Sequence, residues 1–416
     1  MFKNIKVFFG LFIILVSLMA SCGAKKRTSS QSDPYDTMSI EMRNNNFAWD
    51  IFRVISPEQN TNLIVSPFSI STALAMTYAG ADGQTEEQMS RTLYFSPNDE
   101  AFHAAFSERT RKILEKGKKE EQLSIANSLW PQEGYPFIPE FMELLNEYYG
   151  SALYPVDYMG NREIIRNRIN QWVADHTNNL IKELIKPGVL IPDTRLVLVN
   201  AIYFLSDWKI AFDLNATRPD NFHLNDGSVV RTPFMYMKDE FMYYENNEFQ
   251  LLELPYKGGD FSFLAFLPAE DLSVEDLIKM MDATTFSQSL EQLSNHKVDV
   301  FLPSFKVRSQ MDLEEVLARM GMPLAFSNDA DFSRMTPRND LKIDKVIHEA
   351  YIDVNEEGTE AAASTAVVII RKTAVMDEER DPVFRADRPF IFAIKENSSN
   401  AVLFLGKIEN PSLRAN

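Results

Sequence analysis

The stretch from Asp353 to Thr373, DVNEEGTEAAASTAVVIIRKT, changes character along its length. It begins polar, turns at Gly358, continues through small residues, becomes β-branched and ends in a dibasic pair before its last threonine. In an extended chain Thr359 and every second residue as far as Ile369 share one face, so small side chains come first on that face and large apolar ones last. The dibasic end and the acidic run beyond it are typical of an exposed loop. The stretch therefore has the properties of both a loop and a half-buried strand, and this double character decides how the fold is interpreted.

The composition excludes several classes of function. The chain has 416 residues, a formal net charge of −17 and 45% apolar residues, which suffices for a large core. The acidic balance disfavours binding to nucleic acid, which needs a basic face. One cysteine permits neither an internal disulfide nor a cysteine-based metal cluster, and the five histidines show no metal-ligand spacing. The sequence has no nucleophile elbow, His-Glu-x-x-His motif or glycine-rich phosphate loop, so we expect neither an enzyme nor a metal or cofactor site.

The N-terminal residues are typical of an export signal. Residues 1–21 carry Lys3 and Lys6 before an apolar run that is too short for a comfortable membrane span. Cys22 follows Met-Ala-Ser in a pattern that resembles a bacterial lipoprotein box, in which the cysteine is lipidated and becomes the mature N-terminus. We therefore expect a lipoprotein signal peptide over 1–21 and a flexible tether over 22–38. The expected location is the outer membrane or cell surface, on the extracellular or periplasmic side. A plain signal peptide with an incidental cysteine is the alternative.

Helices are predicted mainly in the first half of the chain. The segment 39–55 has the apolar spacing of a helix packed on a core. Ser66 is a good N-cap and Pro67 suits the first position of a second helix, which we expect to end at Gly80. Apolar residues at helical spacing over 165–173 predict a further amphipathic helix.

Strands are predicted mainly in the second half. The run from Leu196 to Phe204 is almost continuously apolar, as in a strand buried on both faces, and Asn200 interrupts it with an amide that needs partners. A helix is expected over Asp312–Met320. Because no Pro/Gly-rich linker divides the chain after residue 40, we predict one α+β domain over 39–416. Further strands are predicted at Leu123–Trp130, Leu251–Tyr256, Phe261–Leu267, Val298–Leu302, Pro389–Ile394 and Ala401–Ile408.

Five ordered motifs make the chain resemble the serpins, a family of serine protease inhibitors, from about residue 40 to its end. Any one motif alone would be weak, but together they span nearly the whole predicted domain. They are the strand–helix start NLIVSPFSIS (62–71), the strand LVNAIYF (198–204) with Trp208 after it, the hinge (353–363), FRADRPF (384–390) and LFLGKIENP (403–411).

The resemblance implies three β-sheets, about eight or nine helices and an exposed reactive-centre loop over about 356–386. In inhibitory members a serine protease attacks this loop and forms an acyl-enzyme; the cleaved loop then inserts into the central sheet and distorts the protease. The scissile residue is expected about sixteen positions after Glu356. That residue is Lys372, so the implied reactive bond is Lys372–Thr373, with Arg371 as the alternative cleavage point.

A lysine at this position suits a protease whose specificity pocket carries a carboxylate, as in trypsin. The expected partners are therefore trypsin-like serine proteases. Elastase-like, subtilisin-like and cysteine proteases form a broader alternative range. The protein is expected to act as a monomer.

The resemblance also implies roles for three groups of residues. Thr359, Ala361 and Ala363 are small enough to enter between packed strands, whereas a charge at these positions would stall entry of the loop. The chain departs from the family at Ser304, where a lysine commonly pairs with the hinge glutamate, and Lys306 is the candidate replacement. The groups are the hinge (Glu356, Gly358, Thr359, Glu360, Ala361, Ala362 and Ala363), the shutter (Ser66, Ser69, Asn200 and His348) and the breach (Trp208).

Two other functions remain open at this point. A non-inhibitory serpin would act as a binding or chaperone-like protein that proteases merely cleave, but the run of small hinge residues favours inhibition. A hydrolase is disfavoured because the sequence shows no nucleophile–base pair.

Overall fold

A computed structural model describes residues 35, 37–58, 61–117, 122–134, 136–150, 153–338, 340–359 and 381–414. The predicted signal peptide and Cys22 lie outside the described residues, as does all but the end of the tether. The same is true of Glu360, Ala361, Ala362, Ala363, Arg371, Lys372 and Thr373.

The described part of the chain contains nine α-helices, in agreement with the eight or nine expected. Six precede residue 180, which confirms that helices concentrate in the first half. No described helix is long and apolar enough to cross a bilayer. The helices are α1 Ile40–Ile55, α2 Pro67–Tyr78, α3 Gly83–Leu93, α4 Glu100–Lys116, α5 Pro139–Tyr149, α6 Tyr158–His176, α7 Val274–Met280, α8 Ala283–Glu291 and α9 Glu314–Met320, with 3₁₀ turns η1 Ser56–Glu58 and η2 Pro323–Phe326.

The starts of α1 and α2 follow from their caps. The side chain of Ser39 accepts a hydrogen bond from the backbone N–H of Met42, and that of Ser66 accepts one from Ser69. Pro67 occupies the first turn of α2, where a backbone N–H has no partner within the helix. The missing N–H of proline therefore costs no hydrogen bond there. Every residue of α2 is buried, so this helix forms part of the core.

Among the described residues, the first sheet has five strands in the order β2-β3-β11-β10-β9. β3 and β10 run parallel, and the other neighbours are antiparallel. The two-residue strand β11 lies between β3 and β10 at one end only. The strands are β2 Gln122–Pro131, β3 Leu196–Asp207, β9 Phe305–Asp312, β10 Lys345–Val354 and β11 Gly358–Thr359.

The second sheet has nine strands in the order β1-β14-β13-β7-β6-β5-β8-β12, with β4 paired to β5. The described strands thus form two hydrogen-bonded sheets rather than the three expected. The reason is the length of β5, which pairs in turn with β4, β8 and β6 and joins what would otherwise be separate sheets. The strands are β1 Leu63–Val65, β4 Arg218–His223, β5 Val229–Glu245, β6 Phe249–Pro255, β7 Phe261–Pro268, β8 Ser294–Pro303, β12 Val383–Arg385, β13 Phe390–Glu396 and β14 Ala401–Ile408.

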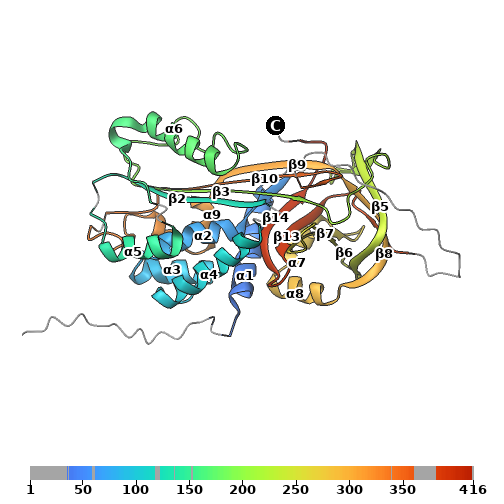
Figure 1. Cartoon of the computed structure of the whole chain (residues 1–416), viewed down its shortest axis with the longest axis horizontal. Helices are drawn as coiled ribbons and strands as arrows, with labels where there is room; N and C mark the ends of the chain where they lie inside the picture. The colour runs from blue at the N-terminus through green and yellow to red at the C-terminus, as the bar shows by residue number, and fades with distance from the viewer. Residues whose placement is uncertain are drawn as a thin grey trace, which may run out of the picture. The chain divides into compact units, whose positions relative to one another are not determined.

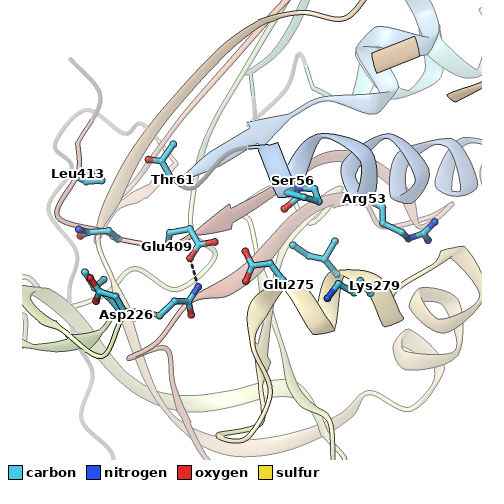
Figure 2. A pocket seen from close by; sticks show the side chains of 13 residues that line it. Arg53, Ser56, Thr61, Asp226, Glu275, Lys279, Glu409 and Leu413 are labelled. Carbon is cyan, nitrogen blue, oxygen red and sulfur yellow. Dashed lines mark hydrogen bonds between the residues drawn. The ribbon is translucent and has the colours of Figure 1, made fainter. Parts of the chain in front are cut away.

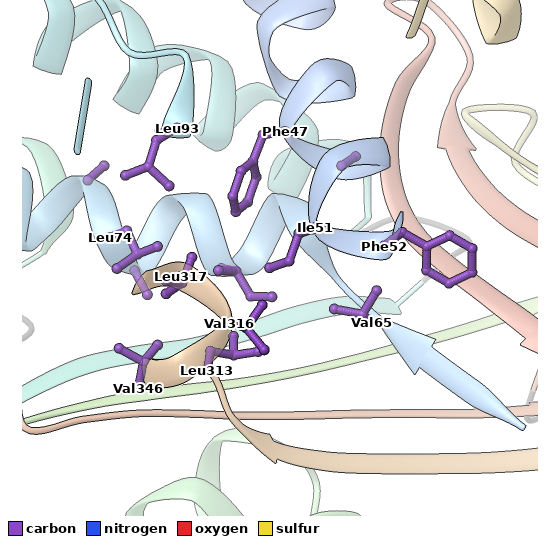
Figure 3. Close-up of a cluster of buried hydrophobic side chains, with 14 of the residues drawn as sticks. Phe47, Ile51, Phe52, Val65, Leu74, Leu93, Leu313, Val316, Leu317 and Val346 are labelled. Carbon is purple, nitrogen blue, oxygen red and sulfur yellow. The ribbon is translucent and has the colours of Figure 1, made fainter. Parts of the chain in front are cut away.

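Both faces of the five-stranded sheet are covered. In Figure 1, α6 lies on one side of β2 and β3 while α2 lies on the other. Val197 and Val199 of β3 pack in the cluster with α6, whereas Leu198 packs in the cluster with α1, α2 and α9. Figure 3 shows part of that second cluster, including Leu74 of α2 and Val346 of β10. Burial on both faces explains why β3 is apolar at nearly every position.

Candidate functional site

The line where β3 and β10 run side by side is the place at which the predicted loop insertion would occur. The two strands pair directly from Val197 opposite Lys345 to Tyr203 opposite Tyr351. Beyond that point β11 separates them. We call this line the seam; its upper end is the end that holds β11.

At the upper end the chain leaves β10 in a tight turn and immediately re-enters the sheet. The backbone N–H of Asn355 donates to the carbonyl of Gly358 at 2.9 Å, and the Asn355 side-chain oxygen accepts from the N–H of Glu357 at 3.0 Å. Thr359 then pairs with Val354 on one side, and on the other side lies opposite Ser206 of β3. The first two residues after the turn are therefore already strand, although the sequence placed them in the exposed loop.

Gly358 and Thr359 fit this position for different reasons. A Cβ on Gly358 would lie 2.1 Å from the carbonyl oxygen of Ser206, so only glycine allows the two backbones to approach this closely. The side chain of Thr359 is fully buried, and its hydroxyl lies 2.6 Å from the hydroxyl of Tyr256. The upper end is thus closed by a buried hydrogen bond.

Trp208, the expected breach residue, lies directly under this turn. Its indole N–H donates to the carbonyl of Asn355 at 2.8 Å, and its backbone N–H donates to the carbonyl of Glu357 at 2.8 Å. The indole also stacks on Tyr256 with ring centroids 4.8 Å apart. Trp208 therefore contacts both the turn and the tyrosine that binds Thr359.

Glu356 has a partner that the sequence did not indicate. The hydroxyl of Thr217, in the segment before β4, donates to the Glu356 carboxylate at 2.7 Å. Lys306 does not take the role of the missing lysine, because it lies directly opposite Asp353 in the β9–β10 pair and binds that carboxylate at 2.8 Å. The hydrogen bond to Asp353 raises the pKa of Lys306. At Ser304, the position of the missing lysine, the hydroxyl accepts from Arg414 at 2.7 Å.

The shutter residues meet in the middle of the seam. Asn127 of β2, Asn200 of β3 and His348 of β10 lie opposite one another in register and form a polar row across three strands. The Asn200 amide donates to the side-chain oxygen of Asn127 and to the hydroxyl of Ser69. Ser66 donates its hydroxyl to the carbonyl of Leu403 at 2.7 Å. All four predicted shutter residues are therefore brought together, and all are fully buried.

The hydrogen bonds of His348 define its tautomer. The backbone N–H of Ser66 donates to Nε2 at 3.2 Å, so Nε2 is an acceptor. Nδ1 consequently carries the proton and donates to the side-chain oxygen of Asn200. Burial lowers the pKa of His348 to about 3, so the ring is neutral at physiological pH. A neutral imidazole is what this row requires, since protonation of Nε2 would remove the acceptor for Ser66.

Sequence reasoning missed Asn127, Thr217 and Tyr256. For Asn127 a signal existed: it is an isolated amide within a predicted apolar strand, as Asn200 is. For Thr217 and Tyr256 nothing in the local pattern points to the hinge, because each contact joins segments more than one hundred residues apart in sequence.

The described ends of the expected reactive-centre loop are both held in sheets. β11 holds the N-terminal end between β3 and β10. At the C-terminal end, Val383–Arg385 forms β12 beside β8, with Phe384 fully buried. The range of about 356–386 expected for the loop thus includes two strands. The reason is that burial of the Thr359 and Phe384 side chains stabilises the fold more than their exposure would.

Comparison with known proteins agrees with this arrangement. The family model described as serpin (serine protease inhibitor) matches residues 42–411. The chain is 38% identical over 387 residues to leukocyte elastase inhibitor of Sus scrofa, covering 89% of this chain and 99% of that protein. It is 34% identical over 397 residues to an uncharacterized serpin-like protein of Methanosarcina mazei, covering 94% of this chain and 91% of that protein.

Solved structures give the same result. Uncleaved ovalbumin is 29% identical with a TM-score of 0.80, covering 90% of this chain and 100% of that chain. The thermophilic serpin tengpin in its native state is also 29% identical with a TM-score of 0.80, covering 89% of this chain and 93% of that chain. The fold, the motifs in their places and these matches lead to one conclusion: the chain belongs to the serpin family.

Proposed function

We propose that this serpin inhibits serine proteases by covalent trapping, with insertion of its cleaved loop into the seam. The observation that carries the proposal is the position of β11. Gly358 and Thr359 already pair with β3 in the antiparallel sense that an inserted strand would continue. The relationship to leukocyte elastase inhibitor supports a role against proteases.

If the pairing of β11 with β3 continues along the loop, its register predicts the extent of insertion. Gly358 lies opposite Asp207 and Thr359 opposite Ser206. Continuing this pairing would place Ile369 opposite Leu196, where β3 begins. The loop would then fill the seam along all of β3, and Arg371 and Lys372 would emerge just beyond its end. The length of the loop before Lys372 thus matches the length of the strand that would receive it.

The same register gives a role to a residue in the middle of the loop. Thr365 would come to lie opposite Asn200 and face the same side of the sheet, because directly opposed residues of an antiparallel pair share a face. In the uncleaved protein, Nδ1 of His348 donates to the side-chain oxygen of Asn200. After insertion, the Thr365 hydroxyl could accept from this Nδ1 and donate to this oxygen. Insertion would therefore break one buried hydrogen bond and supply a replacement.

The energy available from insertion is large. Insertion replaces the single ladder between β3 and β10 by two ladders, a net gain of roughly a dozen hydrogen bonds at about 0.5–1.5 kcal/mol each. Burial of Val367 and Ile369 adds roughly 1.5–3 kcal/mol apiece. The total is on the order of 10–20 kcal/mol, comparable with the stability of a whole domain.

The proposed chemistry is that of a serine protease that is trapped as its acyl-enzyme. The protease serine attacks the carbonyl of Lys372, the C–N bond to Thr373 breaks, and the new amine of Thr373 takes a proton from the catalytic histidine. Lys372 is left as an ester on the protease serine. Insertion then draws the attached protease toward the far end of the seam before water can hydrolyse that ester. A basic residue at this bond makes trypsin-like enzymes the proposed targets, and cleavage after Arg371 would give the same outcome with a loop one residue shorter.

The test is incubation with trypsin, followed by denaturing electrophoresis and N-terminal sequencing. The expected result is a protease–inhibitor band that survives denaturation, with a released fragment that begins at Thr373. Trypsin whose serine has been replaced by alanine is the matched control and should give no such band. Complete cleavage of the chain with fully active trypsin and no covalent band would contradict inhibition and favour the non-inhibitory alternative.

We also propose that Cys22 carries a lipid that anchors the exported protein to the outer membrane or cell surface. The lipoprotein-like pattern before Cys22 supports this proposal. Mass spectrometry of protein expressed in a bacterium that processes lipoproteins should find a diacylglyceryl-modified cysteine at the N-terminus. A free thiol at Cys22 would contradict the proposed lipid anchor.

A further inference from the structure

A pocket of about 540 Å³ lies outside the seam and plays no part in the proposed inhibition (Figure 2). Its walls come from the end of α1, from α7, from the turn between β4 and β5 and from the residues after β14. The residues that matter for its chemistry are Arg53, Ser56, Leu224, Glu275, Ile278 and Glu409.

Two carboxylates in this pocket share one buried cation. The ammonium group of Lys407 lies 2.9 Å from Glu275 and 2.8 Å from Glu409, and the Lys407 side chain is almost wholly buried. The side-chain amide of Asn225 donates to the second oxygen of Glu409 at 2.8 Å. The dashed line at Glu409 in Figure 2 marks a hydrogen bond. At a pH at which both carboxyl groups are ionised, one positive charge thus serves two negative ones. Burial, and then the hydrogen bond between the two carboxyl groups, raise the pKa of Glu409 to about 7.

The other charges around the pocket do not compensate this excess. Arg53 is paired with Asp50 at 3.0 Å, and Lys279 with Asp276 at 3.0 Å. Asp226, in the turn between β4 and β5, also lines the pocket. It accepts hydrogen bonds from Ser228 and adds a further negative charge. The pocket therefore favours a positively charged ligand.

A second observation points to a ligand rather than to a structural acid pair. The hydroxyl of Ser56 is buried and has no hydrogen-bond partner among the residues that the structure describes. Nε of Arg53 is also buried without one, while the other two nitrogens of that guanidinium bind Asp50 and the carbonyl of Met281. Buried polar groups are normally satisfied, so both donors lack an acceptor that a ligand could supply.

We propose that this pocket binds a small organic cation that also carries a hydroxyl or carbonyl group. Its ammonium would lie beside Glu275 and Glu409 on the pocket side, whose wall does not include Lys407. Its acceptor would face Ser56 and Arg53, and an apolar body would pack on Leu224 and Ile278. A metal ion fits less well, since no group of three or more His, Cys, Asp or Glu in the described part of the chain could hold one. This proposal is independent of protease inhibition.

The test is isothermal titration of the intact protein with phenylalaninol, which combines an ammonium, a hydroxyl and an apolar ring. At pH 8 we expect saturable binding at one site. 3-Phenyl-1-propanol, which lacks the ammonium, should not bind measurably, and 2-phenylethylamine, which lacks the hydroxyl, should bind about fivefold more weakly. Equal affinity for the neutral alcohol, or no binding of either amine, would overturn the proposal.

Variants locate the site. Glu409→Gln and Glu275→Gln should each weaken phenylalaninol binding about tenfold or more. Glu253→Gln is the matched control, because Glu253 is similarly buried and also pairs with a buried lysine, Lys395, at 3.0 Å. Binding should be unchanged in that variant. Loss of affinity only in Glu253→Gln, or in none of the three, would contradict the assignment.

The pH dependence gives a readout that a purely structural acid pair would not show. Because the cation requires the ionised form of Glu409, affinity should fall as the pH is lowered from 8 to 6. In Glu409→Gln the affinity should vary much less over this range. The same slope in the variant and the natural protein would show that another group controls binding.

Discussion

The two parts of the seam between β3 and β10 are held in different ways. At the upper end the strands are already parted, and Gly358 and Thr359 occupy the gap. In the middle the strands pair directly, and the Asn200–His348 hydrogen bond joins them. The seam is therefore open to a third strand at its upper end and closed by direct pairing in its middle.

The difference indicates where the barrier to insertion lies. At the upper end the backbone pairs of Thr359 are already made, and the next residues on its face of an extended chain, Ala361 and Ala363, are small. In the middle, each further residue must break a strand pair and eventually a buried polar row. Under the proposed mechanism, the upper end would decide whether the loop can enter the sheet, and the middle would decide how long the uncleaved protein resists insertion.

The largest expected effect comes from placing a charge at the upper end. Thr359→Arg would bury a guanidinium where the threonine hydroxyl now meets Tyr256, and this should block insertion. We expect the covalent trypsin complex to disappear while the loop is still cleaved, as measured by denaturing electrophoresis. Glu357→Arg, at a partly exposed position of the same turn, is the control and should retain the complex. Full inhibition by Thr359→Arg would show that insertion does not proceed through this end.

Breaking the polar row in the middle should have the next largest effect. Asn200→Ala leaves Nδ1 of His348 without its buried partner and removes one hydrogen bond each from Ser69 and Asn127, so we expect the free energy of unfolding to fall by about 3 kcal/mol. Urea denaturation measures this change, and native gels after warming should show faster loss of the native band.

Asn127→Ala tests the residue that the sequence analysis missed. Because Asn127 belongs to the polar row, Asn127→Ala should also lower the free energy of unfolding. The control Asn295→Ala, at the exposed end of β8, should change it by less than about 0.5 kcal/mol. Equal changes in the free energy of unfolding for Asn127→Ala and Asn295→Ala would show that Asn127 does not stabilise the polar row.

The middle of the seam should also be sensitive to acid. The pKa of His348 in the folded protein, about 3, lies below its ordinary value of 6.5. As the pH falls below 6.5, the unfolded chain takes up a proton that the folded protein does not, so stability decreases. This residue should contribute a slope of about 1.4 kcal/mol per pH unit between pH 6 and pH 4.

Urea denaturation at several pH values measures this slope. His103, whose burial lowers its pKa to about 4, adds to it in the natural protein. In His348→Asn the slope should decrease by the contribution of one proton while that of His103 remains. An unchanged slope in the variant would show that His348 is already charged in the folded state.

The smallest expected effect concerns the hydrogen bond that closes the upper end. Tyr256→Phe removes the hydroxyl that meets Thr359 and should lower the free energy of unfolding by about 1 kcal/mol. Thr359→Val removes the other partner. If the two hydroxyls serve each other, the double variant should be more stable than the sum of the single effects predicts, as a double-mutant cycle would show. Additive effects would mean that the pair is not coupled.

Much of this architecture could be predicted from local patterns. Ser66 and Pro67 mark the start of α2, and the apolar run from Leu196 marks β3. The predicted helix over Asp312–Met320 appears as α9, with Gly321 in the positive-φ conformation that ends it. These elements depend on neighbours in sequence, which a pattern can reveal.

The features that control the seam depend on pairing between distant segments. The match of Asn127 to Asn200 follows from strand register, and the contact of Thr217 with Glu356 depends on the path of the chain before β4. The joining of two sheets into one depends on the seventeen residues of β5 pairing with three different strands. No local pattern contains this information, so only the structure provides it.

The central claim is that the cleaved loop fills the seam, and thermal unfolding before and after cleavage tests it most directly. The loop can be cut at the dibasic pair by a brief treatment with a protease that releases its product, and the two forms compared by calorimetry. If the loop inserts beside β3 from Gly358 to Ile369, the cleaved protein should unfold at a temperature higher by more than about 10 °C. A cleaved protein that unfolds at the same temperature as the intact one, or lower, would contradict the account.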